Sequence, residues 1–166
     1  MAFDGITIAA MVKELHLNLD GGRFNKIAQP EADELLITGK GANGQCRLLL
    51  SASASLPLIY FTSKNKPSPM TAPNFCMLLR KHIGSARVSD IRQPGMERVV
   101  MFELEHLNEL GDPCKKVLIM ELMGKHSNII FCDDKGMILD SIKHVSSHMS
   151  SCLLYTSPSP RDRQKS

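Results

Sequence analysis

Tryptophan is absent from this sequence, aromatic residues make up only 5% of it, and no long apolar run is present. Hydrophobic residues nevertheless account for 43% of the 166 residues, which is enough for one domain with a core built mainly from Leu, Ile, Val and Met. The longest apolar runs fall well short of the roughly 18 residues that a membrane span requires. The N-terminus also lacks a basic stretch followed by an unbroken apolar one, so we expect neither a membrane span nor a signal peptide.

The cysteines form no CxxC pair and show no regular spacing. The five positions are Cys46, Cys76, Cys114, Cys132 and Cys152. Scattered cysteines of this kind predict reduced thiols in a cytoplasmic protein, and they favour neither a disulfide framework nor a zinc site. We therefore expect no metal and no other cofactor.

Residues 152–166, CLLYTSPSPRDRQKS, lack the periodicity of a helix or a strand. The first eleven of them equal the translation of a transposase-type sequencing adapter in one frame. We therefore interpret this tail as a disordered cloning or assembly artefact, with the natural reading frame lost near Ser151. Removing it deletes three Lys or Arg and one Asp, so the net charge falls from +3 to +1 and gives little evidence for a nucleic-acid partner.

Apolar periodicity and turn residues predict two helices and nine strands, with no internal repeat. The helices are expected at residues 6–19, with Asp4 as N-cap and Gly21-Gly22 after the end, and at residues 72–83, with Thr71 or Asn74 near the start. The strands are expected at residues 23–27, 34–38, 46–51, 58–62, 86–92, 98–105, 116–122, 127–132 and 137–144. The segment DDKG predicts a hairpin between the last two strands. These elements indicate an α+β domain in which antiparallel sheets pack face to face in a β-sandwich-like arrangement.

Four stretches together resemble a known domain family. They are MAFDG at residues 1–5, GGRFNKIAQPEADELLI at residues 21–37, LLRKHI at residues 78–83 and MELMGKHSNIIFCDDKGMILDSIKHVS at residues 120–146. Residues 1–151 resemble part of the N-terminal NFACT domain of the RqcH-like family, also labelled FbpA or fibronectin-binding-protein-like. Full-length members of that family continue into a helix-hairpin-helix segment, a coiled coil and an NFACT-R domain, so this chain resembles roughly their first quarter.

The resemblance implies a cytoplasmic factor of ribosome quality control that is not an enzyme. RqcH-like proteins bind large ribosomal subunits obstructed by peptidyl-tRNA, recruit alanyl-tRNA and support untemplated addition of alanine to the stalled chain. Their N-terminal domain is similar in fold to the N-terminal domain of formamidopyrimidine-type DNA glycosylases. Glycosylase activity is not expected here, because those enzymes use an N-terminal Pro as nucleophile and this chain has Ala2-Phe3.

A surface adhesin is the alternative that the fibronectin-binding label raises, with fibronectin as a secondary partner. The chain shows no signal peptide and no anchor motif, and its cysteines fit reduced thiols. These features argue against secretion and favour the ribosomal interpretation.

The resemblance also implies a tRNA-binding site, because the family carries an Asp-Arg pair needed for tRNA engagement. Glu97 and Arg98 stand at the matching positions here, with an acid one methylene longer. A guanidinium can form paired bonds to a phosphate or a base edge, although an Arg that begins a strand can also be an ordinary exposed residue. The match of MAFDG adds Asp4 to this site, while local rules explain Asp4 equally well as a helix cap.

The segment MGKHSN admits two interpretations. As plain structure, Gly124 forms a turn, Lys125 and His126 face solvent, and Ser127 and Asn128 bond the nearby backbone. As a functional group, the same four polar residues could contact the RNA backbone or a 2′-hydroxyl. A Ser-His catalytic relay is poorly placed, because neighbouring residues of a strand point to opposite faces.

The remaining candidate RNA contacts are basic residues in two other segments. They are Arg23, Lys26, Arg80, Lys81 and His82. The first two also fit an exposed strand face, and the last three end a predicted helix, where positive charge favours the helix dipole.

Overall fold

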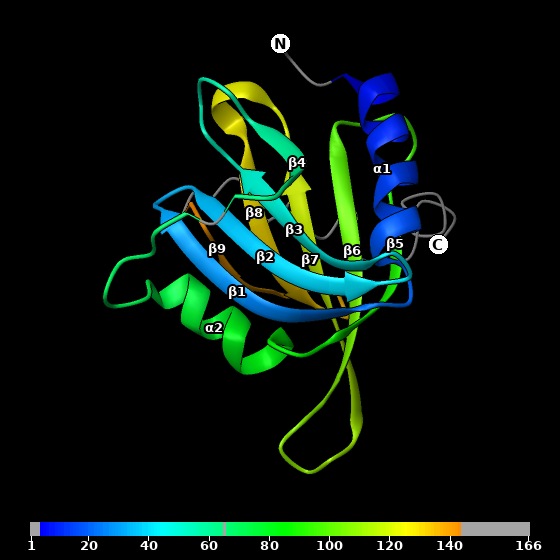
Figure 1. Cartoon of the computed structure of the whole chain (residues 1–166), viewed down its shortest axis with the longest axis vertical. Helices are drawn as coiled ribbons and strands as arrows, with labels where there is room; N and C mark the ends of the chain where they lie inside the picture. Colours follow the sequence, from blue (N-terminus) through cyan, green and yellow to red (C-terminus); the bar gives the residue numbers. More distant parts are fainter. Residues whose placement is uncertain (1–3, 65, 144–166) are drawn as a thin grey trace, which may run out of the picture.

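The computed structural model describes residues 4–64 and 66–143 (Figure 1). The expected disordered tail at residues 152–166, and the last residue of the strand expected at 137–144, lie outside the described residues. Neither helix of the described chain is long and apolar enough to cross a membrane.

Nine antiparallel strands form one sheet in the order β4-β3-β2-β1-β5-β6-β7-β8-β9. Their bounds are β1 Arg23–Glu31, β2 Glu34–Gly41, β3 Gly44–Ser51, β4 Leu58–Thr62, β5 Arg87–Arg92, β6 Val99–Leu107, β7 Pro113–Glu121, β8 Asn128–Asp133 and β9 Ile138–Ser141. All nine predicted strands are confirmed, and the prediction of an antiparallel α+β domain is confirmed with them. The likeness to the glycosylase domain stays a prediction.

Several strands are longer than predicted, because hairpin turns extend the ladders. β2 and β3 remain paired up to Gly41 and Gly44, and Gly44 adopts a φ of 95°, which only glycine adopts readily. β1 continues beyond residue 27 and contains Pro30, which lies within a register shift between Ala28 and Glu31. A bulge of this kind tolerates a residue without a backbone N–H.

The sheet bends where β1 meets β5, so that its two halves share one core. Arg23 and Arg87 are the residue pair that joins these two strands. Across the core, the ring of Phe24 on β1 lies 6.4 Å from the ring of Phe102 on β6. Figure 1 shows β1, β2 and β3 crossing in front of the strands of the other half. The expected face-to-face packing is therefore formed by one bent sheet instead of two separate sheets.

The first helix, α1 (Gly5–Leu19), begins as predicted. The carboxylate of Asp4 accepts a hydrogen bond of 2.8 Å from the Thr7 N–H, and such N-caps typically contribute about 1 kcal/mol. The helix buries Ile8, Leu15 and Leu19 and packs on β2, β5 and β6. The apolar spacing in the sequence thus predicted the buried face correctly.

The second helix, α2 (Asn74–Ile83), begins two residues later than predicted. Pro73 occupies its N-cap, and no described side chain caps it, so neither Thr71 nor Asn74 acts as a cap. Its buried residues are Phe75, Cys76, Leu79 and Ile83, and they pack toward β1 and β6. The basic residues 80–82 lie in the last turn of this helix.

The central strands β6, β7 and β8 are apolar on both faces. A second cluster on these strands is formed by Val99, Met101, Val117, Ile119, Ile130 and Cys132. Double-sided burial explains why their sequences are nearly continuous apolar runs without clear alternation. Cys46, Cys76 and Cys114 are free thiols, as expected.

Candidate nucleic-acid interface

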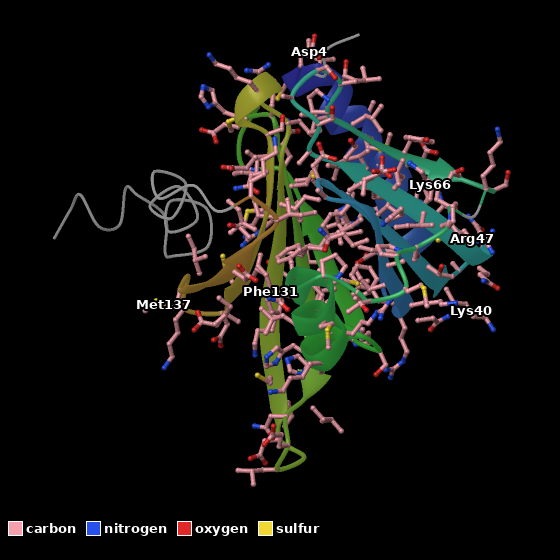
Figure 2. The ribbon with its side chains drawn as sticks, turned by 90° about the vertical axis from the view of Figure 1, so that its left-hand side faces the viewer. Asp4, Lys40, Arg47, Lys66, Phe131 and Met137 are labelled. Atoms are coloured by element: carbon pink, nitrogen blue, oxygen red, sulfur yellow. The ribbon has the colours of Figure 1, made fainter. Side chains whose placement is uncertain are left out.

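The structure brings together the three residues that the family resemblance marks for tRNA binding. Asp4, Glu97 and Arg98 line one shallow depression of about 510 Å³ at the N-terminal end of α1. Figure 2 shows Asp4 at this end of the molecule. The other lining residues are Gly5, Met96 and Met123, so the MGKHSN segment begins at the rim of the same depression.

Hydrogen bonds hold the loop that carries Glu97 and Arg98 against the first turn of α1. The Gln93 side-chain amide donates to the carbonyl of Gly5 at 3.0 Å and to that of Glu97 at 2.6 Å. On the other side, the N–H of Leu122 donates to the carbonyl of Arg98 at 2.9 Å. The two charged side chains therefore project from a fixed backbone and are exposed.

The charges around the depression leave the Arg98 guanidinium available for a ligand. Among the described residues, no carboxylate lies within 4.0 Å of it. The Asp4 carboxylate is engaged by the N–H of Thr7, and this hydrogen bond lowers its pKa, so Asp4 carries a negative charge at neutral pH. Arg98 is thus a cation that can donate hydrogen bonds to a phosphate or to a base edge here.

A buried acid, Glu121, lies near the depression and was missed by sequence reasoning. It is the last residue of β7, it is 1% exposed, and its backbone pairs with those of Val99 and Asn128. Burial raises the pKa of Glu121 to about 7, and the negative charge of Glu97 adds to the rise. The one signal in the sequence was an acid inside the apolar run VLIMEL.

The structure separates the four polar residues of MGKHSN into two pairs. Residues Gly124–His126 form a single 3₁₀ turn, which leaves the Lys125 and His126 side chains exposed. Ser127 and Asn128 are fully buried, and the Ser127 hydroxyl accepts a hydrogen bond of 2.9 Å from the N–H of Met123. Ser127 and Asn128 therefore bond the nearby backbone, as the structural interpretation expects. Only Lys125 and His126 present their polar side-chain atoms at the surface.

Hydrogen bonds of the Asn128 side chain hold the end of the described chain against β8. Its side-chain oxygen accepts a hydrogen bond from the N–H of Lys143 at 3.0 Å, and its side-chain amide donates to the carbonyl of Lys143 at 3.0 Å. These two bonds satisfy a buried amide and explain why a polar residue follows the turn. β8 begins at this residue, one position later than predicted.

The other predicted contacts lie at the opposite end of β6. Arg23, Arg80, Lys81 and His82 line two adjoining cavities of about 360 and 500 Å³ between α2 and the hairpin that joins β6 to β7. Lys26 is exposed on β1 and is not among the lining residues. The cavities also contain residues that the sequence did not single out, namely Arg87, His106 and Lys116. They come from strands that are distant in the sequence, so no local pattern could indicate them.

One group of side chains in the described part of the chain has the spacing of a metal site. Ligand atoms of His16, Asp20 and Asp90 lie within 4.8 Å of one another near the end of α1. The group is largely solvent-facing, and His16 forms an ordinary i,i+4 pair at 3.5 Å with Asp20, the C-cap of α1. The expectation that this protein uses no cofactor stays a prediction.

The chain is similar in sequence to proteins that are named as factors of ribosome quality control. The matching family model is that of NFACT N-terminal and middle domains, over residues 4–156. The Rqc2 homolog RqcH of Bacillus subtilis (strain 168) is 40% identical over 154 residues, which are 91% of this chain and 27% of that protein. The ribosome quality control complex subunit NEMF of Mus musculus is 28% identical over 141 residues, which are 85% of this chain and 12% of that protein. The chain thus spans about a quarter or less of the length of these relatives.

Solved structures share the fold. The N-terminal domain of the fibronectin-binding protein PavA from Streptococcus pneumoniae matches with a TM-score of 0.84 and 38% identity, over 87% of this chain and 55% of that one. The fibrinogen binding protein from Staphylococcus aureus matches with a TM-score of 0.80 and 32% identity, over 89% of this chain and 53% of that one.

Proposed function

The chain belongs to the family of NFACT N-terminal and middle domains, and on this basis we propose that it is the tRNA- and large-subunit-binding module of a cytoplasmic ribosome quality control factor. In this role it engages large ribosomal subunits obstructed by peptidyl-tRNA, holds alanyl-tRNA and supports untemplated addition of alanine to the stalled chain. It contacts tRNA and rRNA without catalysing a reaction, because the ribosome performs the peptidyl transfer.

The observation that carries this proposal is the convergence of Asp4, Glu97 and Arg98 on one depression. These residues come from the start of α1 and from the loop before β6, yet they line the same surface. Arg98 is exposed, has no carboxylate within 4.0 Å in the part of the chain that the structure describes, and projects from a loop held by hydrogen bonds. An exposed guanidinium on a fixed backbone, with no carboxylate beside it, can form paired hydrogen bonds to a phosphate or to a base edge.

The acid beside Arg98 has a complementary role in the proposed contact. The Glu97 carboxylate is exposed and can accept a hydrogen bond from a 2′-hydroxyl or from an amino group of a base. Asp4 orders the first turn of α1 and thereby positions the other side of the depression. Lys125 and His126, just after the rim residue Met123, extend the same surface with positive charge and hydrogen-bond donors.

The second candidate function is that of a surface adhesin for fibronectin. It is favoured by the similarity to the domain of PavA, which is named as a fibronectin-binding protein. The two functions place the protein on different sides of the cell membrane, so fractionation separates them.

Sedimentation of cell lysates tests the ribosomal proposal. The protein expressed from its complete gene should travel with large ribosomal subunits, and crosslinking should recover tRNA with it. An Arg98→Ala variant should lose the tRNA crosslink, whereas Lys135→Ala, a change of an exposed Lys in the β8–β9 turn, should keep it. Recovery of the protein only in the culture medium and on the cell surface, with no association with ribosomes, would favour the adhesin.

A further inference from the structure

A second groove lies at the opposite end of the molecule from the Asp4 depression. It consists of the two adjoining cavities between the end of α2, the start of β5 and the β6–β7 hairpin. Figure 2 shows Asp4 at one end and this hairpin at the other. β6 has nine residues, so roughly 30 Å separate the two sites along this strand. One compact ligand group therefore cannot occupy both, and the groove needs an explanation of its own.

Positive charge is concentrated in this groove. Five Lys or Arg residues line it against two Glu, whereas the whole chain has 20 Lys or Arg against 17 Asp or Glu. The lining cations are Arg23, Arg80, Lys81, Arg87 and Lys116. The groove thus carries an excess of positive charge that the remainder of the chain does not share.

Lys116 is the buried cation of the groove. The residue is only 8% exposed, and within the described chain no carboxylate lies within 4.0 Å of its ammonium group. Instead, the ammonium donates to the Cys114 sulfur at 2.9 Å and to Nε2 of His106 at 3.3 Å. An ammonium that lines a cavity with no opposite charge beside it is electrostatically unfavourable, so Lys116 would stabilise an anion bound there.

A second electrostatic cost lies at the junction of the two half-sheets. Arg23 and Arg87 stand directly opposite each other on β1 and β5. Arg87 is 3.3 Å from the Glu105 carboxylate, whereas Arg23 donates to the neutral carbonyl of Ser85 at 3.1 Å. Like charges at opposed positions destabilise a sheet, and an anion between them would reverse the sign of this interaction.

Two imidazoles supply aromatic rings to the groove. The rings of His82 and His106 meet edge to face at 6.2 Å, and the ring of His82 lies 5.9 Å from that of Phe131. Because an ammonium can only donate, Nε2 of His106 accepts from Lys116, and Nδ1 carries the proton that it donates to the carbonyl of Leu107. Burial lowers the pKa of both histidines, so they are neutral at neutral pH and offer aromatic faces.

We propose that this groove binds an unpaired stretch of RNA, with phosphates on Lys116, Lys81 and the Arg23-Arg87 pair and with a base against the imidazoles of His82 and His106. Cations that follow the backbone, together with rings that stack on bases, are the combination that recognises single-stranded RNA. An RNA duplex has no unstacked base that could lie against the rings, and an acidic peptide contains no base. The inference rests on the proposed function in taking RNA as the anion, and it adds a second, separate contact.

Binding of a short unstructured, fluorescently labelled RNA oligonucleotide tests this inference, measured by anisotropy over a range of salt concentrations. The variants are Lys81→Ala, which changes an exposed side chain, and Lys116→Met, which removes the charge of a buried side chain and keeps most of its length. Each should weaken binding about tenfold, as expected for the loss of one charge-assisted contact, and should lower the salt slope by about one. Lys135→Ala should change neither quantity, and thermal unfolding checks that each variant is folded.

The outcomes distinguish the groove from the Arg98 site. The second contact is established if Arg98→Ala binds tRNA more weakly but binds the oligonucleotide as the original chain does, and if Lys81→Ala binds the oligonucleotide more weakly but keeps its affinity for tRNA. If the oligonucleotide binds but Lys81→Ala and a folded Lys116→Met bind it as the original chain does, the inference is wrong and the proposed function is unaffected. Equal binding of an RNA duplex, or displacement by polyglutamate at equal charge, would show that the groove recognises charge alone and would overturn the assignment to unpaired RNA. If the original chain binds neither tRNA nor the oligonucleotide, both proposals fail.

Discussion

Gly5, in the first turn of α1, lies directly against the carbonyl of Met96, in the loop that carries Glu97 and Arg98. A Cβ at position 5 would collide with that carbonyl, so no residue other than glycine fits without movement of the loop. This contact and the hydrogen bond from the Gln93 amide to the Gly5 carbonyl hold the first turn of α1 and the loop before β6 together, so that the two segments form one surface.

Replacing Gly5 tests this docking directly. Gly5→Ala should lower the free energy of unfolding by about 1–3 kcal/mol, the usual cost of overpacking, and should also weaken tRNA binding by displacing Arg98. Urea denaturation and tRNA titration measure the two effects. Ile6→Ala is the matched control, because Ile6 is 73% exposed in the same turn. Equal stability and equal tRNA affinity for Gly5→Ala and Ile6→Ala would contradict this account of the loop.

The buried amide of Asn128 should be important for stability. Asn128→Ala removes both hydrogen bonds from a fully buried side chain to the Lys143 backbone, although the Lys143 carbonyl keeps its bond from the Ser141 hydroxyl. We therefore expect a loss of about 2–3 kcal/mol in thermal or chemical unfolding. Lys125→Ala, at an exposed position three residues earlier, should stay within about 0.5 kcal/mol of the original chain. A loss for Asn128→Ala no larger than that of Lys125→Ala would show that the two bonds contribute little.

Glu121 should make the stability depend on pH. Its pKa is about 7 in the folded state and lies near the ordinary glutamate value of 4.5 when the chain is unfolded, so the folded chain holds this proton to higher pH. The stability from this group is therefore full below about pH 4.5, falls as the pH rises toward 7, and is flat above that.

Glu121→Gln keeps a neutral side chain at all pH values and should remove this fall. By linkage the effect amounts to at most about 3 kcal/mol between pH 5 and pH 8, measured as the urea dependence of unfolding at each pH. Glu31→Gln, at an exposed position, serves as the control for a change of net charge. Parallel pH profiles for the original chain and Glu121→Gln would mean that Glu121 does not carry a raised pKa.

The secondary structure could be predicted because it depends on local signals. Strands such as Leu58–Thr62 were predicted with the observed bounds, and Asp4 was predicted as a cap from its position before an apolar helix face. The errors fall at turns such as the one before Gly44, where the ladder continues into the glycines. The bend of the sheet could not be predicted, since the Arg23–Arg87 pairing depends on residues 64 positions apart.

The candidate site was predictable only in part, and for a similar reason. The family resemblance indicated Glu97 and Arg98, but their proximity to Asp4 required the fold. Ser127 and Asn128 are of residue types that also suit a surface contact with RNA, and only their burial shows that they serve the structure. Lys116 carries no signal in the sequence, because its burial results from the packing of α2 against the hairpin region.

The affinity of tRNA for the original chain, Arg98→Ala and Arg98→Lys is the most direct test of the central claim that the Asp4–Glu97–Arg98 depression holds tRNA. We predict that Arg98→Ala weakens binding at least tenfold while the free energy of unfolding changes by no more than about 0.5 kcal/mol, as for an exposed residue. Arg98→Lys should recover only part of the affinity, because an ammonium cannot form paired bonds. Unchanged tRNA affinity in a folded Arg98→Ala variant, or a loss of affinity that is matched by a large loss of stability, would contradict the claim.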